Sequence, residues 1–303
     1  MKLLILTADT LLPLGSNLNK LPFHLSIDFE DLAYDLLRSI NEEPKVSAYA
    51  LKLSYDLMHQ FSETKLNGKK LTFFTTGTVA RTMPDILKQM VQDGHEVGSH
   101  YNLHDLMYKQ SNYEIAKNLE IAKESIFKAS GQEPIGFRAP VFSITPNRLD
   151  IFREIDKFFK YDSSHVLNLS RHNKNYYDTL EPFNSINLVE IPVVPKGYLM
   201  GRAQIKSGGT FLRLFSKKII KEVMYFNHEN GYTPLVYMHP YDYLTNQEFW
   251  VPLSEFSRNI KIKNLIKYLR QNQWSRLGNS TVFDKLDYLL DFFDHKGPMS
   301  ESL

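Results

Sequence analysis

Two histidines four positions apart, His100 and His104, follow a short run of strand-forming residues, 95–99. On a helical turn, residues at i and i+4 lie on one face, so both imidazoles could bind one metal ion. A carboxylate commonly completes such a ligand set, and an acidic cluster, 28–31, ends an earlier strand-like run. Two histidines and one carboxylate, with positions left open for water and substrate, predict a hydrolytic site of the zinc type.

The acidic cluster carries three carboxylates, and the strand pattern before it orders them. Apolar Phe23, Leu25 and Ile27 alternate with polar residues, so Asp28 and Glu30 share a face if the strand continues. Metal-assisted hydrolysis needs both a base for the attacking water and a carboxylate for the metal, and one cluster can supply both. The alternative is a solvated helix N-terminus, where the helix dipole favours acidic residues.

Two further strand-like runs end in residues that suit this chemistry. Arg138 ends the run 135–138, and it could pair with Asp28 and hold that carboxylate ionised and oriented. His239 follows the apolar run 235–238 and is a candidate general acid for a leaving nitrogen. A histidine in this role needs a carboxylate to fix its tautomer, and Asp162 is the candidate. A surface arginine and a histidine at the edge of the core are the structural alternatives.

The elements that must position these side chains follow an alternating pattern. Short apolar runs alternate with helical periodicity, which predicts a parallel sheet in an α/β fold. The polar residues of interest lie where strands stop, as in a β/α barrel, whereas a doubly wound sheet would use one crevice. We expect a single barrel domain over 1–293, with C-terminal helices over 259–272 and 282–293. The segment 294–303 is poor in apolar residues and is predicted to be a disordered tail.

The composition excludes several classes of protein. The 303 residues carry 36 basic and 34 acidic side chains, a net charge of +2, which argues against a nucleic-acid or anionic-membrane partner. The absence of cysteine excludes disulfides, thiolate zinc ligands and cysteine nucleophiles. The first apolar run is too short for a signal peptide, and no run approaches the roughly 20 residues that span a bilayer. We therefore expect a cytoplasmic protein. The sequence does not indicate its oligomeric state.

Five segments in the same order make this chain similar to a known family. It resembles the polysaccharide deacetylases of the NodB-homology, carbohydrate esterase 4 class over roughly 21–290, through the segments 28–31, 100–104, 138–140, 161–164 and 236–240. The subgroup it resembles is the one found with exopolysaccharide and O-antigen gene clusters, through 26–31, 136–144 and 208–213.

The resemblance implies a distorted (β/α)7 barrel and a divalent metal, most often Zn²⁺. By matching position, Asp28 would be the base, Arg138 the residue that tunes it, and His239 the general acid. His100 and His104 would bind the metal. Asp162 is a further expected catalytic residue. The expected substrate contacts are Val141, Tyr101 and Phe142, and the backbone N–H of Val141 would donate to an oxyanion.

This chain departs from the commonest family pattern at two places. The family form has adjacent aspartates in the first motif, so the metal carboxylate here could be Glu30 or Asp31. We favour Glu30, because it shares the strand face of Asp28. Tyr101 stands where serine or threonine is usual between the two histidines, so the support of the metal ligands should differ there.

The expected function is hydrolysis of N-acetyl groups on the amino sugars of a poly- or oligosaccharide, and the expected partner is that N-acetylated carbohydrate. One alternative is a related C–N hydrolase acting on a cyclic amide or ureide, with or without metal. Another is a sugar-binding barrel without catalysis. The same chemistry would also permit O-deacetylation. The sequence does not identify the glycan.

Overall fold

The computed structural model describes residues 4–5, 20–169, 186–200, 202–255 and 261–303. Its main sheet has nine strands in the order β1-β7-β6-β5-β4-β3-β2-β10, with β11 beside β2, and every pair in it is parallel. These strands are β1 (Leu4–Ile5), β2 (Leu21–Phe29), β3 (Thr72–Thr75), β4 (Glu96–Ser99), β5 (Gly136–Phe137), β6 (Tyr161–Asp162), β7 (Val189–Glu190), β10 (Leu235–Met238) and β11 (Phe293–His295).

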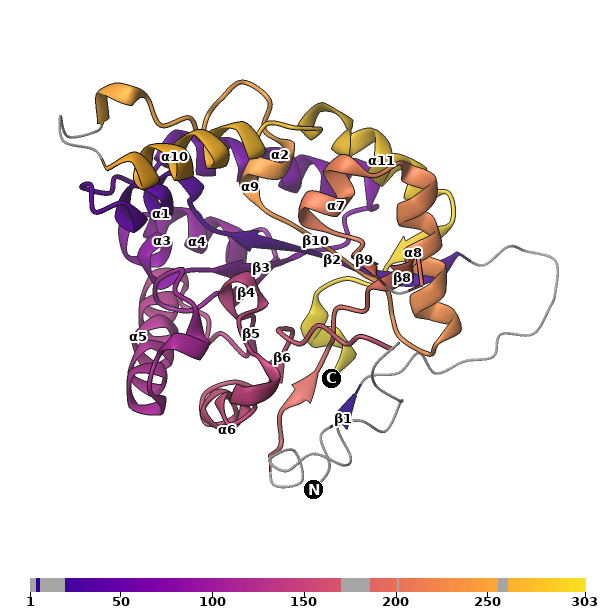
Figure 1. Ribbon diagram of the computed structural model, residues 1–303. Helices are drawn as coiled ribbons and strands as arrows, with labels where there is room; N and C mark the ends of the chain where they lie inside the picture. The colour runs from indigo at the N-terminus through magenta and orange to yellow at the C-terminus, as the bar shows by residue number, and fades with distance from the viewer. Residues whose placement is uncertain (1–3, 6–19, 170–185, 201, 256–260) are drawn as a thin grey trace, which may run out of the picture.

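Helices surround the sheet and connect successive strands (Figure 1). Pro84 lies in the first turn of α4, and Gly131 takes a left-handed φ of 76° where α5 ends. The α-helices are α1 (Leu32–Ser39), α2 (Ala48–Lys65), α3 (Gly77–Thr82), α4 (Pro84–Gln92), α5 (Asn112–Ser130), α6 (Ile151–Asp156), α7 (Gly209–Leu214), α8 (Lys217–Glu229), α9 (Pro240–Tyr243), α10 (Ile262–Trp274) and α11 (Val282–Leu290).

Alternation along the strands separates an outer core from the barrel interior. On β3, Phe73 packs in the large core that includes residues of α2 and α4, whereas Phe74 belongs to a separate interior cluster. On β10, Val236 packs outward and Tyr237 packs inward with Phe74. A side-chain period of two on fully buried strands explains this division. It leaves the interior free for polar residues at the ends of the strands.

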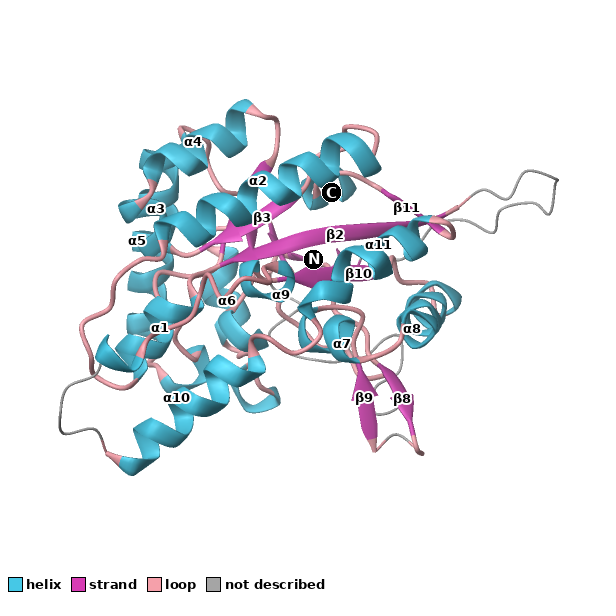
Figure 2. Ribbon diagram, turned by 90° about the horizontal axis from the view of Figure 1, so that it is seen from above, coloured by secondary structure: helices cyan, strands magenta, loops and turns pink. Residues whose placement is uncertain are grey.

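The strand order and the surrounding helices form a distorted β/α barrel in one domain, as the sequence predicts. Among the described residues the two ends of the strand order, β1 and β10, do not pair, so the barrel is open there. Asp28, Arg138 and His239 all lie at or just beyond the carboxyl ends of their strands. A hairpin of β8 (Lys196–Tyr198) and β9 (Ala203–Ile205) projects from the sheet (Figure 2). None of the described helices combines the length and apolar character needed to cross a membrane.

The C-terminal segment differs from the predicted disordered tail. Residues 293–295 form β11, and a 3-10 helix, Met299–Ser302, follows and lies near the middle of the molecule (Figure 1). Met299 is fully buried, its backbone N–H donates to Thr72 Oγ1 at 2.8 Å, and the Ser300 N–H donates to Glu96 Oε2 at 3.2 Å. The segment is ordered because one methionine fills the barrel interior and the backbone finds polar partners there, which its low apolar content did not reveal.

Candidate active site

The end of β2 supplies the acidic residues of the site. Ile27 and Phe29 pack in the outer core, so Ser26 and Asp28 point into the barrel. The same atom, Nη1 of Arg138, donates to Ser26 Oγ at 2.8 Å and to Asp28 Oδ1 at 2.6 Å, which shows that the two side chains share a face. Glu30 follows the strand and is also buried.

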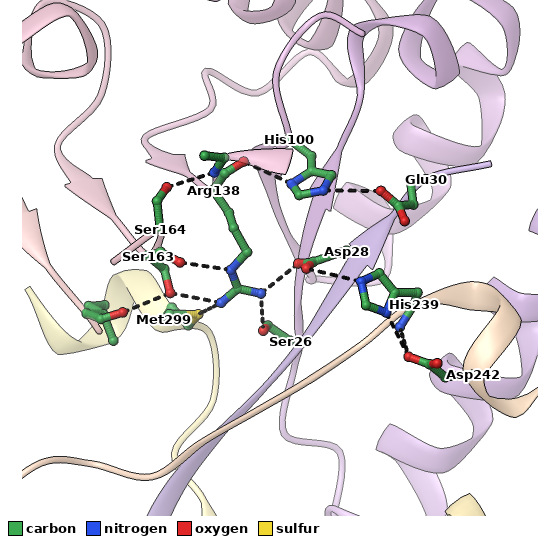
Figure 3. A network of polar contacts seen from close by, with 12 residues as sticks. Ser26, Asp28, Glu30, His100, Arg138, Ser163, Ser164, His239, Asp242 and Met299 are labelled. Carbon is green, nitrogen blue, oxygen red and sulfur yellow. Dashed lines mark hydrogen bonds and ion pairs between the residues drawn. The ribbon is translucent and has the colours of Figure 1, made fainter. Parts of the chain in front are cut away.

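Glu30, His100 and His104 form a cluster whose ligand atoms all lie within 4.8 Å of one another. Glu30 Oε2 is 2.6 Å from His104 Nε2 and 3.3 Å from His100 Nε2. The Nδ1 of His100 donates to the carbonyl oxygen of Arg138 at 2.9 Å, which turns the lone pair of Nε2 toward Glu30 (Figure 3). His100 Nε2 and Glu30 Oε2 are buried and lack a well-aligned hydrogen bond among the described residues. This donor set fits a divalent cation.

The charges in the cluster support the same reading. Burial alone would raise the pKa of Glu30, but His104 and His100 hold it well below its usual range. Burial opposes the charged form of His104, yet Glu30 and Asp35 outweigh it and raise the pKa of His104 to about 9. The carboxylate therefore attracts positive charge strongly, and a cation could take the place of the imidazolium proton.

The segment that joins the two histidines is not the predicted helical turn. Residues 102–104 form bends, and Tyr101 has a left-handed φ of 72°. This backbone conformation brings the two rings together, with centroids 5.5 Å apart. Tyr101 is fully buried, donates to Gln110 Oε1 and packs against Phe137, so the prediction that it contacts substrate is wrong.

Asp31 has a structural position instead of a place beside the imidazoles. Its Oδ1 accepts hydrogen bonds from the backbone of Ala33 at 2.9 Å and Tyr34 at 3.0 Å, which caps the N-terminus of α1. Its Oδ2 accepts a further bond from the backbone of Ser47. Both oxygens are engaged, so the structure leaves Glu30 as the carboxylate of the cluster.

Arg138 is fully buried and connects Asp28 to the opposite wall (Figure 3). Besides its bonds to Ser26 and Asp28, its Nη2 donates to Ser163 Oγ at 2.9 Å and its Nε to the Ser163 carbonyl at 3.2 Å. The guanidinium lies 4.3 Å from the ring centroid of Phe74. The predicted pair of Arg138 and Asp28 is present, and the arginine fixes the orientation of that carboxylate.

Asp162 does not contact His239, so its predicted role as the partner of that histidine is wrong. It lies at the end of β6 and accepts hydrogen bonds from Ser164, from N at 2.9 Å and from Oγ at 2.6 Å. Ser164 Oγ in turn accepts from the backbone N–H of Ala139 at 2.7 Å. Asp162 therefore holds the chain that follows Arg138, and burial raises its pKa.

The carboxylate that holds His239 is Asp242. His239 Nδ1 donates to Asp242 Oδ2 at 2.7 Å, while His239 Nε2 lies 3.8 Å from Asp28 Oδ2. Asp242 Oδ1 is 2.7 Å from Arg213 Nε, and both side chains are buried. Sequence reasoning missed Asp242 and Arg213, although a histidine followed by proline and, two residues later, aspartate is typical of a short capped helix.

Replacing Asp242 with asparagine should lower the pKa of His239. Burial disfavours the imidazolium, but Asp242, with smaller contributions from Glu30 and Asp28, raises its pKa to about 9. Without the Asp242 charge, burial opposes the cation with less compensation, so the pKa should fall toward or below 6.5, its usual value. An NMR titration of the imidazole measures this shift. An unchanged pKa would show that Asp242 does not control the protonation of His239.

The loop after Arg138 reaches the cleft through Val141 and Phe142. Both have left-handed φ values, 55° and 51°. Val141 is exposed and lines a cavity of about 530 Å³ together with His104. Phe142 packs edge-on against Tyr237 with ring centroids 4.9 Å apart. Of these two expected substrate contacts, Val141 lines this cavity and Phe142 packs behind it on Tyr237.

The fold and this site together define a class of protein: β/α barrels that hold a carboxylate and two histidines at the ends of their strands. The family model described as polysaccharide deacetylase matches residues 64–157, and a model described as a domain of unknown function, DUF3473, matches residues 169–291. The chain therefore contains a segment that matches the polysaccharide deacetylase family, residues 64–157, as the sequence motifs predicted. The exopolysaccharide subgroup stays a prediction.

Individual relatives cover shorter segments. Over 77 residues, or 25% of its length, the chain is 36% identical to an uncharacterized 30.6 kDa protein of Geobacillus stearothermophilus. Over 76 residues, also 25% of its length, it is 32% identical to the peptidoglycan-N-acetylglucosamine deacetylase PgdA of Listeria monocytogenes. These matches span 29% and 16% of the relatives' own lengths. A crystal structure of a protein from Mycobacterium smegmatis, provisionally described as a polysaccharide deacetylase, also resembles this chain. The alignment covers 98% of this chain and 93% of the other, with a TM-score of 0.55 at 16% sequence identity, and supports the fold.

Proposed function

We propose that this protein is a divalent-metal-dependent hydrolase that removes N-acetyl groups from amino sugars of an oligo- or polysaccharide. The observation that carries the proposal is the cluster of Glu30, His100 and His104, with Asp28 and His239 facing each other beside it. The family and the name of the relative PgdA support the reaction type. They favour N-deacetylation over hydrolysis of a cyclic amide or ureide.

The ligand set favours zinc, because two imidazoles and one carboxylate with open positions are common in catalytic zinc sites. A cation bound by Glu30, His100 and His104 would polarise the acetyl carbonyl and lower the pKa of water. Asp31 would contribute through the fold alone, because its oxygens cap α1.

The protein's own side chains carry the proton transfers. Asp28 accepts a proton from the attacking water, whose oxygen bonds to the acetyl carbon. Arg138 donates to Oδ1 of Asp28, which leaves Oδ2 on the side of His239. The backbone N–H of Val141 stabilises the negative oxygen of the tetrahedral intermediate. His239 donates its proton to the nitrogen as the C–N bond breaks, and acetate and a free amine leave.

The state of His239 supports its role as the acid. Burial opposes the imidazolium, but Asp242 raises the pKa of His239 to about 9, so at neutral pH the imidazole is protonated before the reaction begins. Arg213 holds Asp242 from the far side, which fixes the carboxylate and, through it, the ring. The candidate acid therefore starts in the protonation state that amide hydrolysis needs.

Acetate release from N-acetylated oligosaccharides tests the proposal. We expect purified protein to contain about one divalent ion and to release acetate, and we expect a chelator to abolish this activity and zinc to restore it. Full activity in protein shown by metal analysis to be metal-free would contradict the metal dependence. Absence of acetate from all N-acetylated sugars, with metal bound, would contradict the function.

A further inference from the structure

Lys206 is a cation near the candidate site that lacks a counter-ion among the described residues. It follows β9 and is half-buried, and no hydrogen bond or ion pair joins it to any described residue. Its Nζ lies 4.7 Å from the ring centroid of Phe142. Burial lowers its pKa to about 8. A partly desolvated ammonium with no counter-ion lowers the stability of the fold. Its presence therefore suits a role in binding rather than in folding.

The surroundings of Lys206 connect it to the reacting groups. Phe142 packs on Tyr237, and the Tyr237 ring lies edge-on to His239 with centroids 5.9 Å apart. The chain after Lys206 continues along β10: a Cβ on Gly208 would lie 2.3 Å from the Tyr237 carbonyl oxygen, so only glycine fits. One residue on, a Cβ on Gly209 would lie 3.3 Å from His239 Cε1. A row of contacts therefore leads from Lys206 through Phe142 and Tyr237 to His239.

The rim on the other side of the 141–142 loop also carries excess positive charge. The cavity of about 530 Å³ that contains His104 and Val141 is lined by three cations and two acids, namely Arg38, Lys109, Lys267, Asp35 and Asp105. Asp105 pairs with Arg38 at 2.7 Å, whereas Lys109 and Lys267 form no ion pair with described residues. Cations that lack a counter-ion among the described residues, around Val141 and against Phe142, favour an anionic ligand.

We propose that Lys206 is a substrate-binding residue that pairs with an anionic oxygen, a carboxylate or a phosphate, on a sugar next to the acetamido group that is cleaved. This inference rests on the proposed deacetylation and narrows its substrate to acidic glycans. The ammonium would form a charge-assisted hydrogen bond in a partly desolvated place, where such a bond discriminates strongly.

Three variants and three probes test the inference. Lys206→Met removes the ammonium and keeps an unbranched apolar chain, and Lys206→Arg keeps a cation. The matched control is Lys217→Met. The Nζ of Lys217 also lies 4.7 Å from a ring, that of Tyr288, but Lys217 is exposed at the start of α8 and does not contact the site. The probes are chitotetraose, a tetrasaccharide of alternating N-acetylglucosamine and glucuronate, and N-acetylglucosamine 1-phosphate. Calorimetric binding, acetate release and melting temperature are measured for each variant.

We expect the wild type to bind a charged probe more tightly than chitotetraose, and Lys206→Met to weaken that binding by about 10- to 100-fold. Binding of chitotetraose should not change, and the melting temperature should stay level or rise because an unpaired cation is lost. Lys206→Arg should retain most of the preference, and Lys217→Met all of it. Weaker binding of the glucuronate probe would identify the bound anion as a carboxylate, and weaker binding of N-acetylglucosamine 1-phosphate would identify it as a phosphate.

Each contrary result has a distinct meaning. Equal binding of charged and neutral probes by the wild type, or a preference that survives Lys206→Met, overturns the inference while acetate release leaves the proposed function intact. A fall in melting temperature with equal weakening for all probes would show a structural role and also overturn it. Lys206-dependent binding of a charged probe without any acetate release would support the anion site and contradict the proposed deacetylation.

Discussion

Asp28→Asn should reduce acetate release by about 10²- to 10⁴-fold, the usual contribution of a general base. Asparagine has nearly the same shape and its oxygen can still accept from Arg138, which now donates to Asp28 Oδ1 at 2.6 Å. It cannot accept the proton of the attacking water. Because Asp28 lies outside the cluster of Glu30, His100 and His104, metal content should not change. Turnover number and metal content, measured on the same preparation, give the result.

Asp31→Asn is the matched control for this prediction. It neutralises another buried acid three positions away, but one whose oxygens cap α1 and bind the backbone of Ser47. We expect a loss of about 1 to 2 kcal/mol in the free energy of unfolding and most of the activity to remain. Near-full activity in Asp28→Asn, or an equal loss of turnover in Asp31→Asn, would show that the base has been assigned to the wrong residue.

The sequence could predict the parts of the site that depend on strand parity. Alternation of apolar and polar residues up to Asp28 was enough to place Ser26 and Asp28 on the inner face, where Arg138 binds both. The position of polar residues after apolar runs predicted their common edge, since all strands of the main sheet are parallel. Both features follow from backbone geometry that repeats along every strand.

The sequence could not predict the features that depend on a single unusual backbone conformation or on distant packing. Tyr101 turns into the core because its φ is 72°, a conformation that few residues adopt and that no local pattern announces. Asp162 was a plausible partner for His239 by residue type, yet Asp242, three residues after His239, is the carboxylate that lies within 2.7 Å. Met299 reaches Arg138 from the far end of the chain, with its Sδ 3.8 Å from Nη2.

The candidate site draws on three separate stretches of the chain. Asp28 and Glu30 precede both family-model matches, whereas His100 and Arg138 lie in the first match, 64–157. The residues around the candidate acid, His239 included, lie in the second match, 169–291. One continuous sheet joins them, because β2 pairs with β3 on one side and with β10 on the other. The barrel therefore has to form as one unit before the base and the acid can face each other.

His239→Gln should lower the turnover number for an N-acetylated sugar by about 10²- to 10⁴-fold, because an amine leaves poorly unless it is protonated. The same variant should lose much less activity on 4-nitrophenyl acetate, whose phenolate leaves without a proton. The acid is the imidazolium, which is present below its pKa of about 9, so wild-type turnover should fall as the pH rises through that value. The variant should lack this alkaline decline.

These three readouts separate an acid from a residue that only shapes the cleft. A structural role predicts equal losses on both substrates and leaves the pH profile with its alkaline decline. A second base role predicts a decline on the acid side instead, since the neutral imidazole would then be the active form. His239 Nε2 lies 3.8 Å from Asp28 Oδ2, so in the proposed mechanism both proton transfers take place beside the same reacting group. A loss confined to the poor leaving group, together with the missing alkaline decline, is the pattern that this arrangement requires.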